Sequence, residues 1–174
     1  MNEISLEELL AVIEDTDYYP LFRPLLGYED FIKFYEGIDD SMEHLLDEVQ
    51  DLVGFEFPGD LIHVLLMTNG AKFFDLTLYQ LTEDDNDKNG LYYNNATAPT
   101  RKEFNIPENY LIVGKSSDLF VVCATLDEEG YLSYVLWDTK NKEAGIVYDY
   151  LVEVIMAEID YYTGAFSEGE EDEE

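Results

Sequence analysis

The sequence has almost no cysteine and no long apolar run. Its single cysteine, Cys123, excludes an internal disulfide and any metal motif built from several cysteines. No apolar run approaches the roughly 18 residues that a membrane-spanning helix needs. Residues 1–5 lack the basic and apolar regions of a signal peptide. We therefore expect a cytoplasmic protein that does not bind membranes.

Basic residues are also scarce. Nine Lys and Arg stand against forty Asp and Glu, which gives a formal net charge of −31 at pH 7. A surface of this sign repels nucleic acid, phosphate-rich substrates and anionic lipids, and it attracts basic proteins from a distance. The same charge disfavours self-association, so we expect a monomer whose partner is a basic protein.

Aromatic residues are abundant, and this excludes a disordered acidic chain. The sequence contains fourteen Tyr, ten Phe and one Trp among its 174 residues, enough for the core of one folded domain. Only six of the acidic residues lie in residues 168–174, so the folded part must itself be strongly negative.

Catalytic motifs are missing. The chain has no Gly-rich phosphate loop, no nucleophile elbow and no HExxH pair. His44 and His63 lie away from the apolar stripes of their predicted helices, and Cys123 lies in an apolar run where a thiol is typically inert. Among forty acidic residues, a carboxylate pair suited to glycoside hydrolysis carries almost no information. We expect a protein that is not an enzyme and has no cofactor.

Helical spacing dominates the first third of the chain. Ser5 and Glu8 have capping-box spacing ahead of an apolar stripe that ends at Ile13. Further helices are predicted over residues 28–35, stopping at Gly37, and from a Ser41 cap to Gly54. A short helix begins at Pro58, ends at Asn69-Gly70 and should bury four apolar residues: Leu61, Ile62, Leu65 and Leu66.

Strand patterns follow. Residues 74–79 alternate between apolar and more polar side chains, as in a half-buried strand, and residues 119–124 form an unbroken apolar run typical of a central strand. The other predicted strands are 91–93, 111–113 (followed by a turn over 114–118) and 131–137. Leu151 to Ile159 then has the spacing of a final helix. The order predicts an α+β fold, with N-terminal helices followed by an antiparallel meander sheet and a C-terminal helix.

The middle of the chain contains several motifs in a fixed order. A helix ending in Leu52-Val53-Gly54-Phe55 precedes Phe57-Pro58-Gly59-Asp60, then Asn69-Gly70 and an aromatic strand with Phe73-Phe74. This order resembles the SUKH superfamily, the Smi/Knr-type immunity and cell-wall-synthesis regulator family. Later segments are also similar: Ile112-Val113-Gly114 precedes a polar turn, Tyr134 to Asp138 is a strand containing Trp137, and 147–159 corresponds to a closing helix. The resemblance covers residues 41–162.

This sequence departs from the family pattern in three places. Phe57 replaces the usual Leu before Pro58, Ala71 replaces a frequent second Gly, and the turn over 115–118 lacks the family's glycines. The resemblance implies a non-enzymatic binding protein. Bacterial members look like immunity proteins that neutralise toxins, often nucleases, whereas fungal relatives regulate cell-wall glucan synthesis. We expect three regions: a helical N-terminal extension packed on the core (1–40), a SUKH-like α+β domain (41–166) and a disordered acidic tail (167–174).

One loop resembles a calcium motif. Residues 85–90 match the first half of an EF-hand loop, which has oxygen ligands at positions 1, 3 and 5 and Gly at position 6. The twelfth position, normally Glu, is Ala96, and the flanking segments look like strands. A hairpin turn through Asn89-Gly90 explains the same residues. We predict no metal site and leave calcium binding open as an alternative.

The favoured function is inhibition of a basic toxin domain by an acidic surface, with fast, salt-sensitive association. The partner-binding residues are predicted on two turns: Glu83, Asp84, Asp85 and Asp87, with Asp127, Glu128 and Glu129. A DNA mimic that blocks a DNA-binding protein explains the charge equally well, but not the resemblance. A regulatory scaffold is the third alternative.

Overall fold

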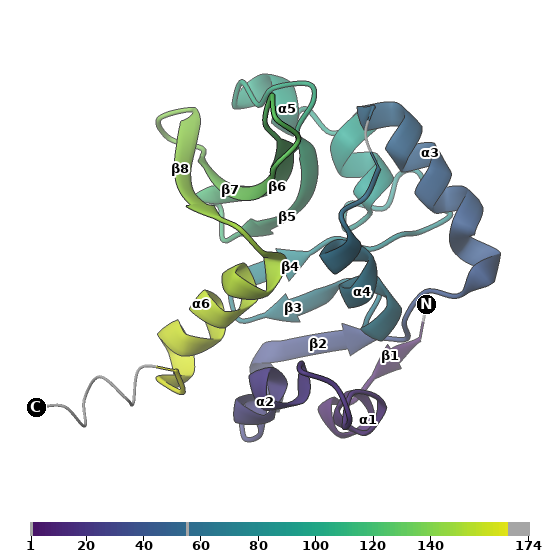
Figure 1. Cartoon of the computed structure of the whole chain (residues 1–174), viewed down its shortest axis with the longest axis vertical. Coiled ribbons are helices and arrows are strands. Elements are labelled where there is room, and N and C mark those ends of the chain that lie inside the picture. The colour runs from purple at the N-terminus through teal and green to yellow at the C-terminus, as the bar shows by residue number, and fades with distance from the viewer. Residues whose placement is uncertain (1, 55, 167–174) are drawn as a thin grey trace, which may run out of the picture.

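The computed structural model describes residues 2–54 and 56–166, which build one antiparallel sheet. Its eight strands lie in chain order from β1 to β8, and each is antiparallel to its neighbours. Helices lie between these strands and after the last of them (Figure 1). The predicted α+β fold, with N-terminal helices, an antiparallel meander sheet and a C-terminal helix, is confirmed.

The N-terminal part contains strands as well as helices. β1 (Glu3–Ile4) precedes α1 (Leu6–Val12), and Ser5 and Glu8 form the predicted capping box. The following elements are α2 (Tyr19–Phe22), the 3-10 turns Arg23–Leu25 and Glu29–Phe31, and β2 (Ile32–Tyr35).

The predicted helix over residues 28–35 is therefore wrong. Its apolar residues fit helical spacing, but Phe34 is buried while Lys33 is exposed, which is the alternation of a strand. β2 pairs with β1 on one side and with β3 on the other. Residues before position 40 thus supply two strands of the common sheet. The division of the chain into the regions 1–40, 41–166 and 167–174 stays a prediction.

Two helices lie where the sequence predicted them: α3 (Glu43–Val53) and α4 (Gly59–Met67). Gly54 ends α3 with a φ of 82°, a left-handed conformation that glycine adopts readily. The start of α3 differs from the prediction. Asp39 rather than Ser41 is the cap of the 3-10 turn Asp40–Met42 that leads into the helix. Leu66, expected in the core, is 53% exposed.

The predicted strand over residues 74–79 is confirmed only for residues 76–78, because residues 74 and 75 form the turn of a tight hairpin. β3 (Ala71–Phe73) and β4 (Leu76–Leu78) pair through Phe73 and Leu76, so the chain reverses at residues 74 and 75. Phe74 has a φ of 58°, which is uncommon for a residue with a side chain. Its ring stacks on that of Tyr162, with centroids 4.4 Å apart.

Residues 91–97 are helical, so the strand predicted over 91–93 is wrong. Tyr93–Thr97 forms a π-helix, and the short α5 (Thr100–Glu103) follows. The side chain of Asn95 explains this placement. Its Nδ2 donates to the carbonyl oxygen of Ile112 at 2.9 Å, and its Oδ1 accepts from the amide of Ile112 at 2.9 Å. The helical segment is thereby joined to the beginning of the next strand.

The last four strands are β5 (Leu111–Ser116), β6 (Phe120–Leu126), β7 (Leu132–Asp138) and β8 (Glu143–Tyr148). The predicted turn over 114–118 begins too early, because Gly114 and Lys115 still pair with β4; the turn covers 117–119. The sequence pattern does not predict β8. Five of its six residues are exposed, so they show no alternation.

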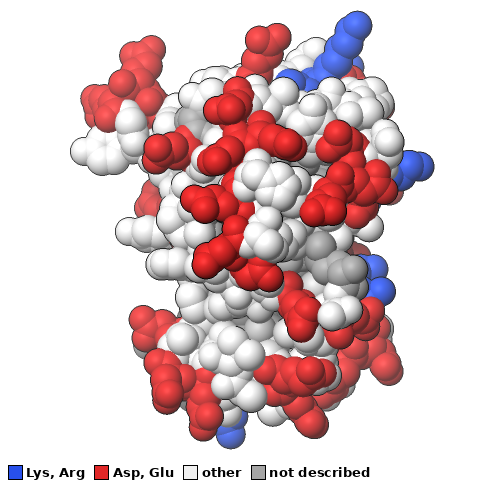
Figure 2. Space-filling model, turned by 90° about the vertical axis from the view of Figure 1, so that its right-hand side faces the viewer, with Lys and Arg blue, Asp and Glu red and all other residues white. Residues whose placement is uncertain are grey.

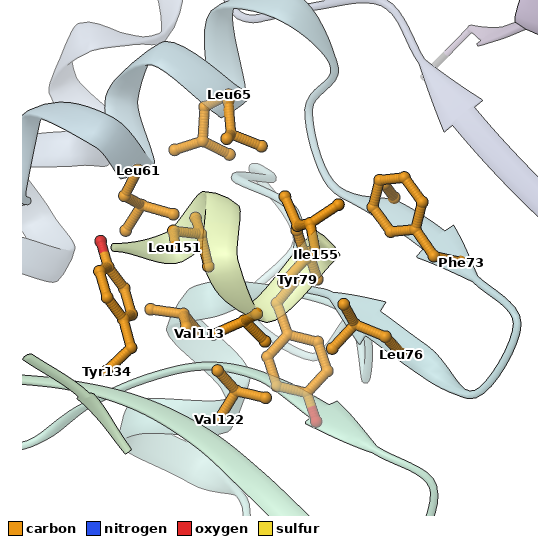
Figure 3. Packing of buried hydrophobic residues seen from close by; sticks show 14 of the residues in the cluster. Leu61, Leu65, Phe73, Leu76, Tyr79, Val113, Val122, Tyr134, Leu151 and Ile155 are labelled. Atoms are coloured by element: carbon orange, nitrogen blue, oxygen red, sulfur yellow. The ribbon is translucent and has the colours of Figure 1, made fainter. Parts of the chain in front are cut away.

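The core lies between the sheet and the helices on one of its faces. α6 (Leu151–Thr163) contacts both α4 and β3 (Figure 1). In Figure 3, Leu61 and Leu65 of α4 point towards Leu151 and Ile155 of α6, near Leu76 of the sheet. Full burial of each such side chain stabilises the folded state by about 1.5–3 kcal/mol. None of the helices in the described part of the chain is long and apolar enough to cross a membrane.

Candidate functional site

The first predicted acidic cluster lies in the loop over residues 79–90, which follows β4. The buried side chain of Asn69 fixes the base of this loop. Its Nδ2 donates to the carbonyl oxygen of Leu81 at 2.9 Å, and its Oδ1 accepts from the amide of Leu81 at 2.7 Å. Across the loop, the amide of Gln80 donates to the carbonyl oxygen of Asn89 at 2.7 Å. Asn69, which sequence analysis treated as a helix stop, therefore also positions the acidic loop.

Two aspartates of the cluster shape the loop itself. The Asp84 Oδ1 accepts from the amide of Asn86 at 2.9 Å, and the Asp87 Oδ1 accepts from the amide of Asn89 at 2.9 Å. Such turns, closed by an Asp side chain, are common in polar loops. Three of the four acids of the cluster are exposed: Glu83, Asp84 and Asp85.

The backbone after residues 85–90 does not follow the course of an EF-hand calcium loop. The chain becomes helical directly after Gly90, before a twelve-residue calcium loop would close. Within residues 2–54 and 56–166, no group of three or more His, Cys, Asp or Glu is arranged to hold a metal ion. Calcium binding has only the sequence pattern to support it.

Acids of this loop share a groove with acids from the N-terminal part of the chain. The groove has a volume of about 590 Å³ and is also lined by Asn2, Asn69 and Gln80. We call it the acidic groove and define it by its five carboxylates: Glu36, Asp39, Glu83, Asp84 and Asp87. Glu36 and Asp39 were not predicted as site residues.

Backbone contacts hold Glu36 at the groove. Its amide donates to the carbonyl oxygen of Asn2 at 2.9 Å, and its Oε2 accepts from the Asn2 Nδ2 at 3.0 Å. The next residue, Gly37, passes so close to α4 that an added Cβ would lie 1.8 Å from the carbonyl oxygen of Leu66. Because residues 28–35 were predicted as a helix, the sequence did not place Glu36 at the groove. The alternation of Lys33 and Phe34 is the signal that would have shown a strand leading to Glu36.

The acidic surface continues onto α3, which begins next to the groove. Four acids of this helix are exposed: Glu43, Asp47, Glu48 and Asp51. Asp47 follows Glu43 by four residues and precedes Asp51 by four, and like charges at this spacing destabilise a helix by about 0.2–0.5 kcal/mol per pair. The last turn of α3 carries no basic residue to offset the helix dipole. Helix stability therefore does not explain these acids, which suit a surface for binding cations.

Few of the acidic side chains are neutralised by neighbouring cations. In the described part of the chain there is a single ion pair, between Lys33 Nζ and Glu3 Oε1 at 3.6 Å. Figure 2 shows the side of the molecule where α3 lies. Asp and Glu recur over the whole of this face, while Lys and Arg stand at its edges. The field around the acidic groove is therefore strongly negative.

The second predicted cluster forms the turn between β6 and β7. The Asp127 Oδ1 accepts from the amides of Glu129 at 2.9 Å and Tyr131 at 2.8 Å, and Gly130 closes the turn with a φ of 87°. Glu128 and Glu129 are exposed. None of the three acids lines the acidic groove, so the structure does not bring the two predicted clusters together in one hollow.

Cys123 and His63 lie outside the acidic groove, whereas His44 is exposed on α3 among its acids. Cys123 is fully buried in β6, and burial raises the pKa of its thiol to about 12, so it stays protonated at neutral pH. His44 and His63 are exposed on α3 and α4, as expected.

The family model SUKH_6, described as SMI1-KNR4 cell-wall, matches residues 43–151. No curated protein matches the chain. The matched stretch runs from the first residue of α3 to the first residue of α6, and it includes both predicted clusters but neither Glu36 nor Asp39.

Proposed function

The chain belongs to the SUKH_6 family, described as SMI1-KNR4 cell-wall, and from this we propose that it is a non-enzymatic immunity protein that binds and neutralises a basic, nuclease-type toxin. Immunity function is common among proteins with this domain. The observation that carries the proposal is the acidic groove beside the uncompensated acids of α3. A nuclease domain needs a basic surface to hold its substrate, and such a surface would be attracted to this groove.

We further propose that the loop cluster makes the first contact. Glu83 and Asp85 project freely, whereas Asp84 and Asp87 hold the loop in shape. The loop is anchored at its base by Asn69, so the backbone that carries these acids is already positioned before the partner arrives. Preorganised charges lose little conformational entropy on binding. The turn carrying Asp127, Glu128 and Glu129 is the second proposed contact.

The first test is affinity capture from a lysate of the native host, loaded at low ionic strength and eluted in salt steps, with mass spectrometry of each step. We expect a basic toxin-type protein that is released only at high salt, because screening weakens contacts between exposed charges. Two charge-reversal variants locate the surface: Glu83→Lys with Asp85→Lys, and Glu128→Lys with Glu129→Lys. Each should reduce the captured amount several-fold.

A matched control makes the same change in net charge outside the two proposed contact clusters. Glu14→Lys with Asp15→Lys reverses two exposed acids that follow α1 and lie outside the family match. This variant should capture the partner almost as well as the unmodified protein. Equal capture by all variants would refute the proposed surface. A housekeeping DNA-binding protein as the captured partner would replace the immunity proposal by DNA mimicry.

A further inference from the structure

The outer face of the sheet carries a row of lysines, an exception to the acidic surface. Along β2 to β5, residues such as Phe34 and Phe73 point into the core, and their neighbours point outward. In the cross-strand register, Lys33 pairs with Lys72, Lys72 with Thr77, and Thr77 with Lys115. Three of the nine basic residues thus form one row across four strands, which we call the lysine row: Lys33, Lys72 and Lys115.

This arrangement is unfavourable for the sheet alone. Like charges directly opposite each other destabilise a sheet, and Lys33 and Lys72 are directly opposite. Lys33 reaches Glu3, but both side chains are about half exposed (48% and 61%), so the pair contributes little. Two of the three lysines of the row, Lys72 and Lys115, are cations without an ion pair in the described part of the chain.

The surface around the row is concave. All three lysines line a hollow of about 520 Å³. Lys33 and Lys72 also line an adjoining hollow of about 730 Å³, together with Phe74 and Tyr162. Asp75 and Asp118 also line the first hollow, where the lysines outnumber the acids by one, whereas Asp30 and Asp75 balance the two lysines of the second. The first hollow is therefore the one that can attract an anionic segment.

The C-terminal end of α6 is fixed beside the same hollow. The Tyr162 ring stacks on Phe74, and its hydroxyl donates to the carboxylate of Asp75. Beyond the helix, the amide of Phe166 donates to the Asp160 Oδ1 at 2.9 Å. Phe166 is thereby held to the last turns of α6, whose Tyr162 lines the hollow of about 730 Å³ with Lys33 and Lys72.

We propose that the acidic stretch over residues 168–174 docks on the lysine row of its own molecule. Six of its seven residues are acidic, and the eight residues after Phe166 can span up to about 26 Å when extended. The acids elsewhere on the surface repel this stretch, whereas the lysine row attracts it. Docking neutralises the lysines and keeps this face of the sheet from attracting other polyanions. The proposal is independent of which partner binds the acidic groove.

The test measures how fast each lysine reacts with an amine-selective acylating reagent, site by site, by mass spectrometry. The full chain is compared with a variant of equal length in which the acids of the stretch are neutral. Its substitutions are Glu168→Gln, Glu170→Gln, Glu171→Gln, Asp172→Asn, Glu173→Gln and Glu174→Gln. At low ionic strength we expect Lys72 and Lys115 to react several-fold faster in the neutral variant.

Internal controls separate docking from a general change of charge. Lys140 and Lys142 are exposed on the turn between β7 and β8, and their rates should be the same in both proteins. At about 1 M salt the difference at Lys72 should vanish, because the Debye length falls to about 3 Å. Equal rates at low salt would refute docking, as would an equal rise at Lys140. Protection that depends on protein concentration would place the stretch of a second copy on the row and refute the intramolecular form.

Discussion

At the scale of single residues, the carboxylate of Asp60 joins three elements. The Tyr134 hydroxyl of β7 donates to its Oδ1 at 2.5 Å, and the Leu151 amide, at the start of α6, donates to its Oδ2 at 2.9 Å. Asp60 itself lies in the first turn of α4. Burial, and secondly the hydrogen bond to Asp60, raise the pKa of Tyr134, so its hydroxyl stays a donor. The family-like sequence Phe57-Pro58-Gly59-Asp60 therefore has a role in assembling the fold.

We expect Tyr134→Phe to lower the free energy of unfolding by about 1.5–3 kcal/mol, the range for a hydrogen bond to a charged group. Urea denaturation followed by circular dichroism measures the change. Tyr131→Phe is the matched control, because Tyr131 is 68% exposed, and its change should stay within about 0.5 kcal/mol. Similar losses in the two variants would show that the Asp60 contact does not stabilise the fold.

At the scale of elements, the helices that could be predicted are those whose ends are marked by residues close together in the sequence. α1 has its capping box and α3 ends at Gly54, and both features need only a few neighbouring residues. β2 and β8 were missed because their identity depends on partners: β2 has one buried residue, and most of β8 is exposed. The same limit applies to the site. The exposed loop acids could be predicted from composition, but Glu36 and Asp39 reach the groove only through the pairing of β2.

The acids of α3 allow a prediction about a whole helix. Asp51→Lys places a cation in the last turn and removes the repulsion with Asp47, so it should stabilise the protein by about 0.5–1.5 kcal/mol. Glu7→Lys makes the same charge change in the first turn of α1, where the dipole favours an acid, and should destabilise it. Thermal unfolding of both variants shows whether Asp51→Lys raises the stability and Glu7→Lys lowers it. Equal stabilisation by both would mean that net charge, not helix position, governs the effect.

At the scale of the whole molecule, charge is segregated over the surface. The acidic groove and α3 occupy one region, and the lysine row lies across the outer face of the sheet. The face in Figure 2 carries acids throughout, with basic residues at its margins. With a net charge of −31 and one ion pair in the described residues, self-repulsion of the folded state is large. The repulsion between acids is therefore concentrated at the acidic groove and α3, where a bound basic partner would reduce it.

This repulsion predicts how stability depends on salt. Raising sodium chloride from about 0.01 M to about 0.15 M shortens the Debye length from about 30 Å to about 8 Å, so repulsion between separated acids is screened. We expect the free energy of unfolding to rise by about 1–2 kcal/mol, which corresponds to a melting temperature about 2–8 °C higher for a domain of this size. Differential scanning calorimetry measures the shift, and glucose at equal osmolarity, which does not screen charge, should leave the melting temperature almost unchanged. A melting temperature that stays constant with salt would mean that the acids are already too dispersed to destabilise the fold, and the acidic groove would then have no excess field to attract a basic partner.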